Sequence, residues 1–195
     1  QNQLTKPPGS LGRLEDVAIQ LAAIQHTERP RVDPVHISIF AGDHGVVAEG
    51  VSVFPQAVTV EMQRNFVNGG AAISVLARQL GATLEVINCG TLADPAALPN
   101  VIHAPVAIQT QNMCETNAMS DAEWEQALLI GWHAAQRAGQ HQAHLLIGGE
   151  MGIGNTTPAA ALAAALIGGD AGQWTGRGTG VNDAGLAQPS GSRYT

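Results

Sequence analysis

The 195-residue sequence has few charged, aromatic and sulfur-containing side chains, and each shortage excludes a class of protein. Only 13% of the residues are charged, and the formal net charge is −7. A general nucleic-acid surface needs clustered Lys and Arg, so this class is excluded. No apolar run approaches the ~20 residues of a membrane-spanning helix. We therefore expect no nucleic-acid partner and no membrane partner.

The sequence contains two cysteines, Cys89 and Cys114, which are too few and too widely spaced for a metal site of the CxxC type. We interpret them as reduced, buried thiols rather than as a disulfide, which favours a cytoplasmic protein. Neither a metal nor another cofactor is predicted.

Ala and Gly are abundant, and this composition is typical of α/β proteins in which helices lie close to a sheet. Short β-branched runs alternate with segments of helical periodicity, which predicts a parallel sheet with right-handed crossovers. A capping box at 120–123 marks one helix start. The sequence predicts strands at 35–41, 83–88, 101–106 and 144–147, and helices at 11–24, 55–66, 71–80, 120–139 and 158–167.

The segment Gly148–Pro158 (GGEMGIGNTTP) is predicted to be a strand-to-helix turn that holds the phosphate of a small molecule. Its glycines let backbone N–H groups approach an anion, and the helix N-terminus favours negative charge. It contains no lysine, which excludes the P-loop of nucleotide triphosphatases. A tight turn without a ligand is the alternative. Glu150 is unusual here because a carboxylate repels phosphate unless it serves a separate group.

Two other polar turns follow the predicted strands. Asp43 and His44 could perform acid–base chemistry, or Asp43 could accept hydrogen bonds from turn amides while His44 packs. The glycine-rich segment at 175–180 carries one cation, Arg177, which could close over a phosphate.

Several large apolar side chains are weaker candidates for a ligand-binding site. Trp124 and Trp132 lie eight residues apart on one helical face, which favours packing over a ligand cage. Phe54 and Met62 flank the helix start near the Asp43 turn. Core packing is the default interpretation for both, and the wall of a pocket for a flat aromatic ligand is the alternative.

Five motifs follow one another along the sequence: KPPGSLGRLE at 6–15, AGDHGV at 41–46 with EGVS at 49–52, GGAAI at 69–73, GEMGIGNTTPAA at 149–160 and GRGTG at 176–180. In this order they resemble the nicotinate-nucleotide–dimethylbenzimidazole phosphoribosyltransferases, which attach the lower base during cobalamin assembly. The resemblance runs from near Thr5 to about Ala187.

The resemblance implies a Rossmann-like parallel sheet with flanking helices, and a small helical domain assembled from both ends of the family's chain. Residues 1–30 then belong to the small domain and residues 31–187 to an incomplete Rossmann-like domain. The implied reaction moves 5-phosphoribosyl from nicotinate mononucleotide to 5,6-dimethylbenzimidazole, giving α-ribazole 5′-phosphate and nicotinate. The resemblance implies no metal. It implies a homodimer or another homo-oligomer.

Site roles follow from the same resemblance. Glu150 matches an active-site glutamate, and Phe54 and Met62 match the base pocket, to which we add Asp43 and His44. The predicted phosphate- or nucleotide-binding residues are Gly152, Ile153, Gly154, Asn155, Thr156, Thr157, Gly176, Arg177 and Gly178. The predicted active-site loop is Pro7, Pro8, Gly9 and Ser10.

The sequence departs from the family at residues 188–195, which do not match the family's next helix. The family continues beyond this point, and its principal catalytic base, a glutamate, lies in that later part. We therefore expect one flank of the sheet to be an unprotected edge or apolar face, covered by oligomerisation. The alternative function is a catalytically impaired, truncated homologue that only binds a phosphate or nucleotide ligand.

Overall fold

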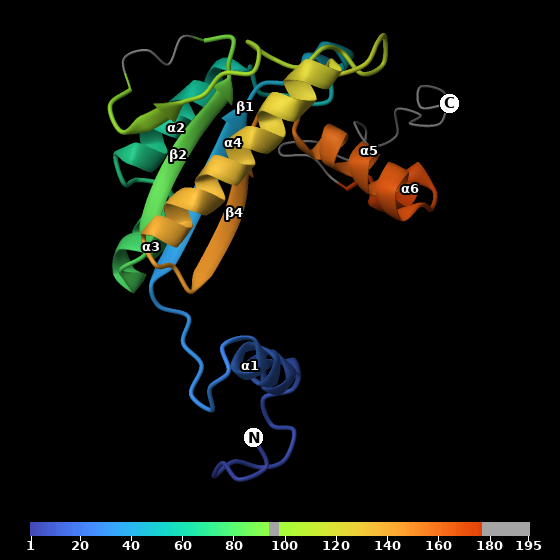
Figure 1. The fold of residues 1–195 in the computed structure, drawn as a ribbon. Coiled ribbons are helices and arrows are strands. Elements are labelled where there is room, and N and C mark those ends of the chain that lie inside the picture. Colours follow the sequence, from blue (N-terminus) through green and yellow to red (C-terminus); the bar gives the residue numbers. More distant parts are fainter. Residues whose placement is uncertain (94–97, 177–195) are drawn as a thin grey trace.

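The computed structural model describes residues 1–93 and 98–176, which form an α/β fold (Figure 1). The predicted tail at 188–195 lies outside these residues. The elements in chain order are α1 Arg13–Ile24, β1 Val35–Gly42, the 3₁₀ helix η1 Gly45–Glu49, α2 Ala57–Val67, α3 Ala72–Leu80, β2 Thr83–Gly90, β3 Val101–His103, α4 Asp121–Gln140, β4 Leu145–Met151, α5 Thr156–Ile167 and α6 Ala171–Trp174.

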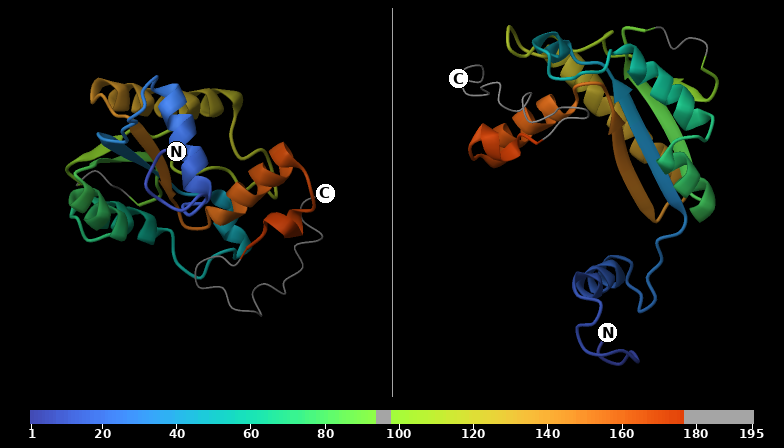
Figure 2. Two further views of the ribbon diagram at one scale, coloured as in Figure 1. Left: turned by 90° about the horizontal axis from the view of Figure 1, so that it is seen from below. Right: turned by 180° about the vertical axis from the view of Figure 1, so that it is seen from behind.

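The strands form one parallel sheet in the order β3-β2-β1-β4, which confirms the predicted fold class. Helices α2 and α3 cover one face of the sheet and α4 covers the other, while α5 projects away from the carboxyl end of β4 (Figure 2). All carboxyl ends of the strands meet at one edge, where ligands bind in open α/β sheets.

The core follows from the alternation of side chains along the strands. Ile37 and Ile39 of β1 and Val86 of β2 belong to the cluster that α2 and α3 cover. Ile87 of β2 packs with Ile130 of α4 on the opposite face. Strand β2 therefore supplies apolar side chains to both layers.

Helix α4 begins as the sequence predicts. The Ser120 hydroxyl accepts a hydrogen bond from the Glu123 amide, and the Glu123 carboxylate accepts one from the Ser120 amide, which completes the capping box. Near its other end, Arg137 donates two hydrogen bonds to Glu85 of β2, at 2.7 and 3.0 Å. This charged pair fixes α4 across the sheet.

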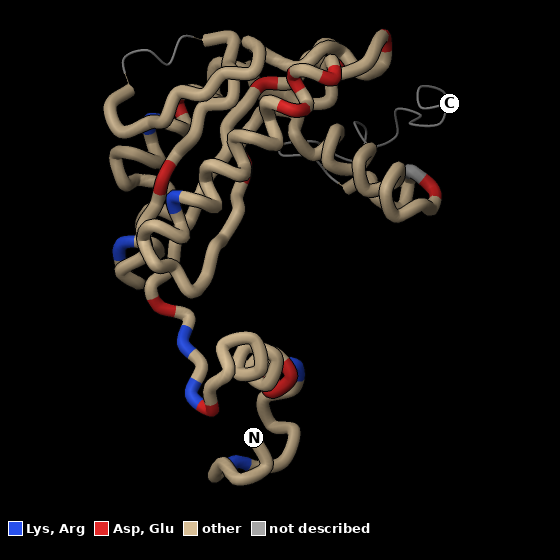
Figure 3. The backbone as a smooth tube through the Cα atoms, viewed as in Figure 1, with Lys and Arg blue, Asp and Glu red and all other residues tan. Residues whose placement is uncertain are grey.

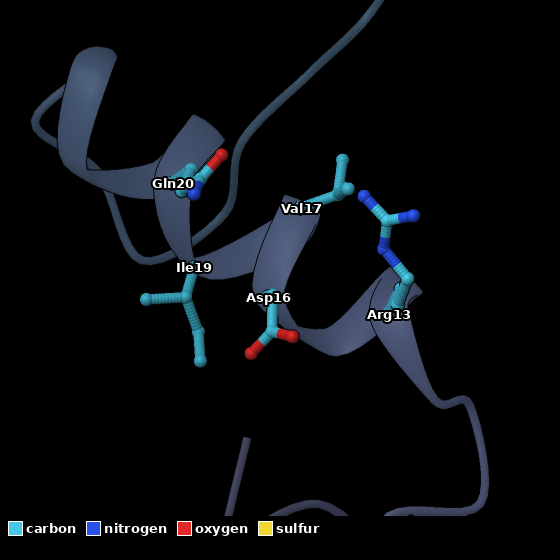
Figure 4. Close-up of a pocket in the computed structure, with 5 residues that line it drawn as sticks. All are labelled: Arg13, Asp16, Val17, Ile19 and Gln20. Carbon is cyan, nitrogen blue, oxygen red and sulfur yellow. The ribbon is translucent and has the colours of Figure 1, made fainter.

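Helix α1 lies apart from the sheet, below the amino ends of the strands (Figure 1). None of its residues is buried, and Leu14 and Ile24 are among its exposed apolar side chains. A pocket on its surface is lined by Arg13, Asp16, Val17, Ile19 and Gln20 (Figure 4). The division into a small domain at 1–30 and a larger one at 31–187 stays a prediction.

The other end of the fold also leaves apolar surface open. β4 pairs only with β1 within the described residues, and Leu145, Leu146 and Ile147 are each exposed by more than a third. Trp124 and Trp132 of α4 are 57% and 63% exposed, so the prediction that they pack is wrong for this chain. Their spacing identifies an apolar face but not what covers it. No helix in the described ranges is long and apolar enough to cross a membrane.

Both cysteines are free thiols, and each is half-buried. Burial raises the pKa of the Cys89 thiol to about 11, so this side chain stays protonated at neutral pH. The two cysteines are unpaired, as expected, but only half-buried, and their reduced state stays a prediction.

Candidate functional site

The predicted phosphate segment is a strand, a short turn and a helix. Gly148–Met151 complete β4, Gly152–Asn155 form the turn, and α5 starts at Thr156. Asn155 occupies the N-cap position, and its side chain makes no capping hydrogen bond. Thr156 and Thr157 lie inside the first turn of α5. The turn lies at the carboxyl edge of the sheet, beside the end of β1.

Two glycines allow the turn to sit tightly against its neighbours. A Cβ at Gly152 would collide with the carbonyl oxygen of Gly42 and would lie 3.0 Å from His44 Nε2. Gly154 has φ of +81°, and a Cβ there would lie 2.7 Å from a methyl group of Val47. Larger residues at either position would force the turn away from β1 and η1.

The backbone amides of this segment alternate between bonded and unbonded. Asn155 N–H donates to Gly152 O and Thr157 N–H donates to Gly154 O, both at 3.1 Å. The amides of Gly154 and Thr156 donate to no acceptor in the part of the chain that the structure describes. Free amides at a helix N-terminus form an anion-binding arrangement.

A buried polar chain lies behind the turn. Asp43 is 2% exposed and Thr59 of α2 is fully buried. The Thr59 hydroxyl donates to Asp43 Oδ1 at 2.6 Å and accepts from Ile153 N–H at 3.2 Å. Asp43 Oδ2 also accepts from the Leu92 amide at 3.0 Å, which agrees with the alternative role of satisfying turn amides.

His44 follows Asp43 in the chain, and its imidazole ring lies against Gly152 of the turn. Burial lowers the pKa of His44, while the nearby Asp43 charge acts in the opposite direction. The neutral imidazole is therefore favoured near pH 7, and a neutral imidazole can accept a hydrogen bond. The His44 carbonyl accepts from Gln56 Nε2 at 3.2 Å, and the same nitrogen donates to Gln109 Oε1.

Glu150 lies in β4, in register with Phe40 of β1. Phe40 packs on the α4 side of the sheet, whereas Ile153 bonds to α2 on the other side. Glu150 is exposed as a residue, yet partial desolvation of its carboxyl group raises its pKa. The Glu150 carboxylate and the Ile153–Thr59 hydrogen bond that anchors the turn therefore lie on opposite faces of the sheet.

Charge around the site is mainly acidic. The acidic positions gather near the start of α4, at the same end of the molecule as the turn, while basic positions lie mostly toward α3 and α1 (Figure 3). Lys6 is the sole lysine of the sequence. An anion at the turn therefore depends on backbone amides within the described residues.

The remaining predicted site residues lie in several places. Phe54 is 43% exposed before α2, while Met62 packs against the core cluster under α2. The loop Pro7–Ser10 is exposed beside α1, and the structure does not bring it to the turn (Figure 1). Gly176 is exposed, and Arg177 and Gly178 lie outside the described residues. The roles assigned to all these residues stay predictions.

Sequence reasoning missed Thr59 and Gln56. Both are polar residues on or next to an apolar helix, and Thr59 shares the buried face of α2 with Gln63, four residues on. A polar pair at that spacing within an apolar stripe is the signal that could have identified the buried network. No cluster of three or more His, Cys, Asp or Glu in the described ranges could hold a metal ion.

Comparisons with known proteins agree with this architecture. A sequence model of a family described as phosphoribosyltransferase matches residues 1–189. Nicotinate-nucleotide–dimethylbenzimidazole phosphoribosyltransferases of Pseudomonas putida and Pseudomonas aeruginosa are 56% and 57% identical, over 95% and 96% of this chain. The matched region is 53% of each relative, so the chain spans about half the length of these curated relatives.

A solved structure gives the same result. The crystal structure of CobT from Thermus thermophilus superposes with a TM-score of 0.89 at 46% identity, covering 95% of this chain and 56% of that one. A second structure from that organism, of a nicotinate-nucleotide–dimethylbenzimidazole phosphoribosyltransferase, gives a TM-score of 0.80 at 47% identity and covers 86% of this chain and 51% of that one. The chain therefore belongs to the phosphoribosyltransferase family that contains the nicotinate-nucleotide–dimethylbenzimidazole enzymes, as its motifs predict.

Proposed function

We propose that this chain carries the phosphate-binding half of an enzyme that transfers 5-phosphoribosyl from nicotinate mononucleotide to 5,6-dimethylbenzimidazole. The products are α-ribazole 5′-phosphate and nicotinate. The observation that carries the proposal is the turn Gly152–Asn155, with the free amides of Gly154 and Thr156 beside it. The names of relatives at 56% and 57% identity support the choice of reaction.

The chemistry places few demands on the protein. An acceptor ring nitrogen forms a bond to the anomeric carbon while the bond to the pyridinium nitrogen breaks, and the electron pair leaves with nicotinate. The pyridinium is already a cationic leaving group. The site must therefore place the acceptor behind the anomeric carbon and remove the acceptor proton.

Glu150 is the described residue that we assign to proton removal. It lies two residues before the phosphate turn, and its raised pKa makes its carboxylate a stronger base. The base pocket is assigned to Phe54 and Met62 with Asp43 and His44. Asp43 reaches that role only through neighbours, because both of its oxygens accept hydrogen bonds from within the fold.

The second candidate is a chain that binds the nucleotide without turning it over. It is favoured by the place of Glu150 on the opposite face of the sheet from the anchor of the turn, while the free amides of the turn suffice to bind an anion. In this case the turn keeps its anion site while Glu150 has no catalytic role.

Turnover with nicotinate mononucleotide and dimethylbenzimidazole separates the two candidates. We expect α-ribazole phosphate from the wild-type chain, and ~100-fold less from Glu150→Gln, the scale of one general base. Glu125→Gln on the exposed face of α4 is the matched control and should leave turnover unchanged. Nucleotide binding without product favours the binding protein, and neither binding nor product contradicts both candidates.

We also propose that the chain is cytoplasmic and forms a homo-oligomer. The unpaired cysteines and the acidic charge support the cytoplasm as the compartment. The exposed apolar side chains of β4 and α4 support self-association. Light scattering of the purified chain tests the oligomeric state. A monodisperse monomer would contradict it.

A further inference from the structure

Thr59 links three parts of the chain that are far apart in sequence. Its hydroxyl group connects Asp43 after β1 with Ile153 in the turn, and it lies on α2 with no exposed surface. Both Asp43 oxygens act as acceptors, one from Thr59 and one from the Leu92 amide. The Thr59 proton is thus used on Asp43, and an oxygen lone pair is left for Ile153 N–H.

This arrangement fixes the direction of one peptide group in the turn. Ile153 N–H points into the protein toward Thr59, while the next amide, of Gly154, has no acceptor among the described residues. Gly154 has φ of +81°, which turns the chain at that point. If Ile153 were released, the turn could rotate its amides toward other orientations and water.

We propose that Thr59 is a positioning residue for phosphate binding: it pins Ile153 N–H inward so that Gly154 and Thr156 N–H stay aimed at the anion. The inference rests on the proposed function of the turn as a phosphate site. Thr59 does not touch the ligand. Its contribution is preorganisation, because a turn held in its binding conformation loses less entropy when phosphate binds.

The direct test replaces the hydroxyl with a methyl group of similar size. Thr59→Val removes both hydrogen bonds, and Thr59→Ser keeps the hydroxyl. Val60→Ala is the matched control, since Val60 is the next residue on α2, is 3% exposed and belongs to the apolar core cluster. It weakens the core without touching the turn.

Affinities for nicotinate mononucleotide and for nicotinate riboside, which lacks the phosphate, are measured for each variant. We expect Thr59→Val to weaken nucleotide binding about tenfold, because the hydrogen bond that holds the Ile153 amide is lost. Riboside binding should stay within about twofold. Thr59→Ser should restore nucleotide binding. Equal losses for both ligands, or the same pattern in Val60→Ala, would overturn the proposal.

Hydrogen exchange at the Ile153 amide separates this proposal from the function on which it rests. A wild-type chain that binds the two ligands equally contradicts the phosphate site. In that case Thr59 still anchors the turn if Thr59→Val speeds hydrogen exchange at the Ile153 amide by at least about tenfold. An unchanged exchange rate would contradict the role of Thr59 as the anchor. If Thr59→Val fails to fold, Thr59→Ala gives the same test, because it also removes the hydroxyl and places no methyl group against Asp43.

Discussion

The two flanks of the sheet differ sharply in how well they are covered. On the closed flank, α2 and α3 pack over β1 and β2, and Ile37 is 3% exposed. On the open flank, formed by β4 and α5, Ile147 is 38% exposed although it lies in register beside Ile37. Two isoleucines of neighbouring strands thus have opposite environments.

The phosphate turn lies where these flanks meet. Its free amides come from the open flank, at the start of α5, while its anchor comes from the closed flank through Thr59. The well-packed layer that contains α2 therefore holds the turn, although the flank from which the turn starts is partly exposed. Thr59 therefore ties the turn to the layer of the fold that contains the main core cluster.

The largest effect is expected from truncating the two register partners. Ile37→Ala should lower the free energy of unfolding by about 3 kcal/mol, because it leaves a cavity under α2 and α3. Ile147→Ala removes the same atoms from a half-exposed site and should cost less than about 1 kcal/mol. Urea denaturation of both variants measures the difference, and equal losses would contradict the two-flank description.

A smaller effect is expected from the charged pair that fixes α4. Glu85 accepts from Arg137 at 2.7 and 3.0 Å and from Ser38 at 2.8 Å. Burial alone would raise the pKa of Glu85, but these hydrogen bonds hold it below the ordinary 4.5. Glu85→Gln should cost about 1–2 kcal/mol at pH 7 because Arg137 loses its partner.

The pH dependence of this pair has a definite sign. A carboxyl group with a lowered pKa in the folded state adds stability above its unfolded value, and this stability disappears as the pH falls below about 4.5. The difference between wild type and Glu85→Gln should therefore shrink in acid. Glu61→Gln, which breaks the exposed pair with Arg64, is the control and should change stability by less than about 0.5 kcal/mol. A constant difference across pH would contradict this origin.

The smallest effect is expected from covering the open flank. Co-expression with the part of the Pseudomonas aeruginosa relative that the match leaves out should slow amide exchange in Leu145–Ile147 by about tenfold, since β4 would gain contacts. Exchange in Ile37 and Ile39 should stay the same, because that strand is already covered. Equal slowing in both strands, or none in β4, would contradict the description of β4 as an incomplete flank.

Local patterns in the sequence predicted the fold well. The apolar run at Val35–Ala41 and the capping box at Ser120 each determine a local structure, and both are confirmed. The exposure of Trp124 and Trp132 could not be predicted, because periodicity shows which face is apolar but not whether another segment covers it. Thr59 was missed because its partners are 16 and 94 residues away in sequence.

The most direct test of the account follows each backbone amide of the ¹⁵N-labelled chain by NMR while nicotinate mononucleotide is added. The account predicts the largest shifts at the amides of Gly154 and Thr156, with little change at Ile153, whose amide stays on Thr59. Nicotinate riboside should leave these amides unchanged. Largest shifts outside Gly152–Thr157, or equal shifts with the riboside, would contradict the claim that this turn holds the phosphate.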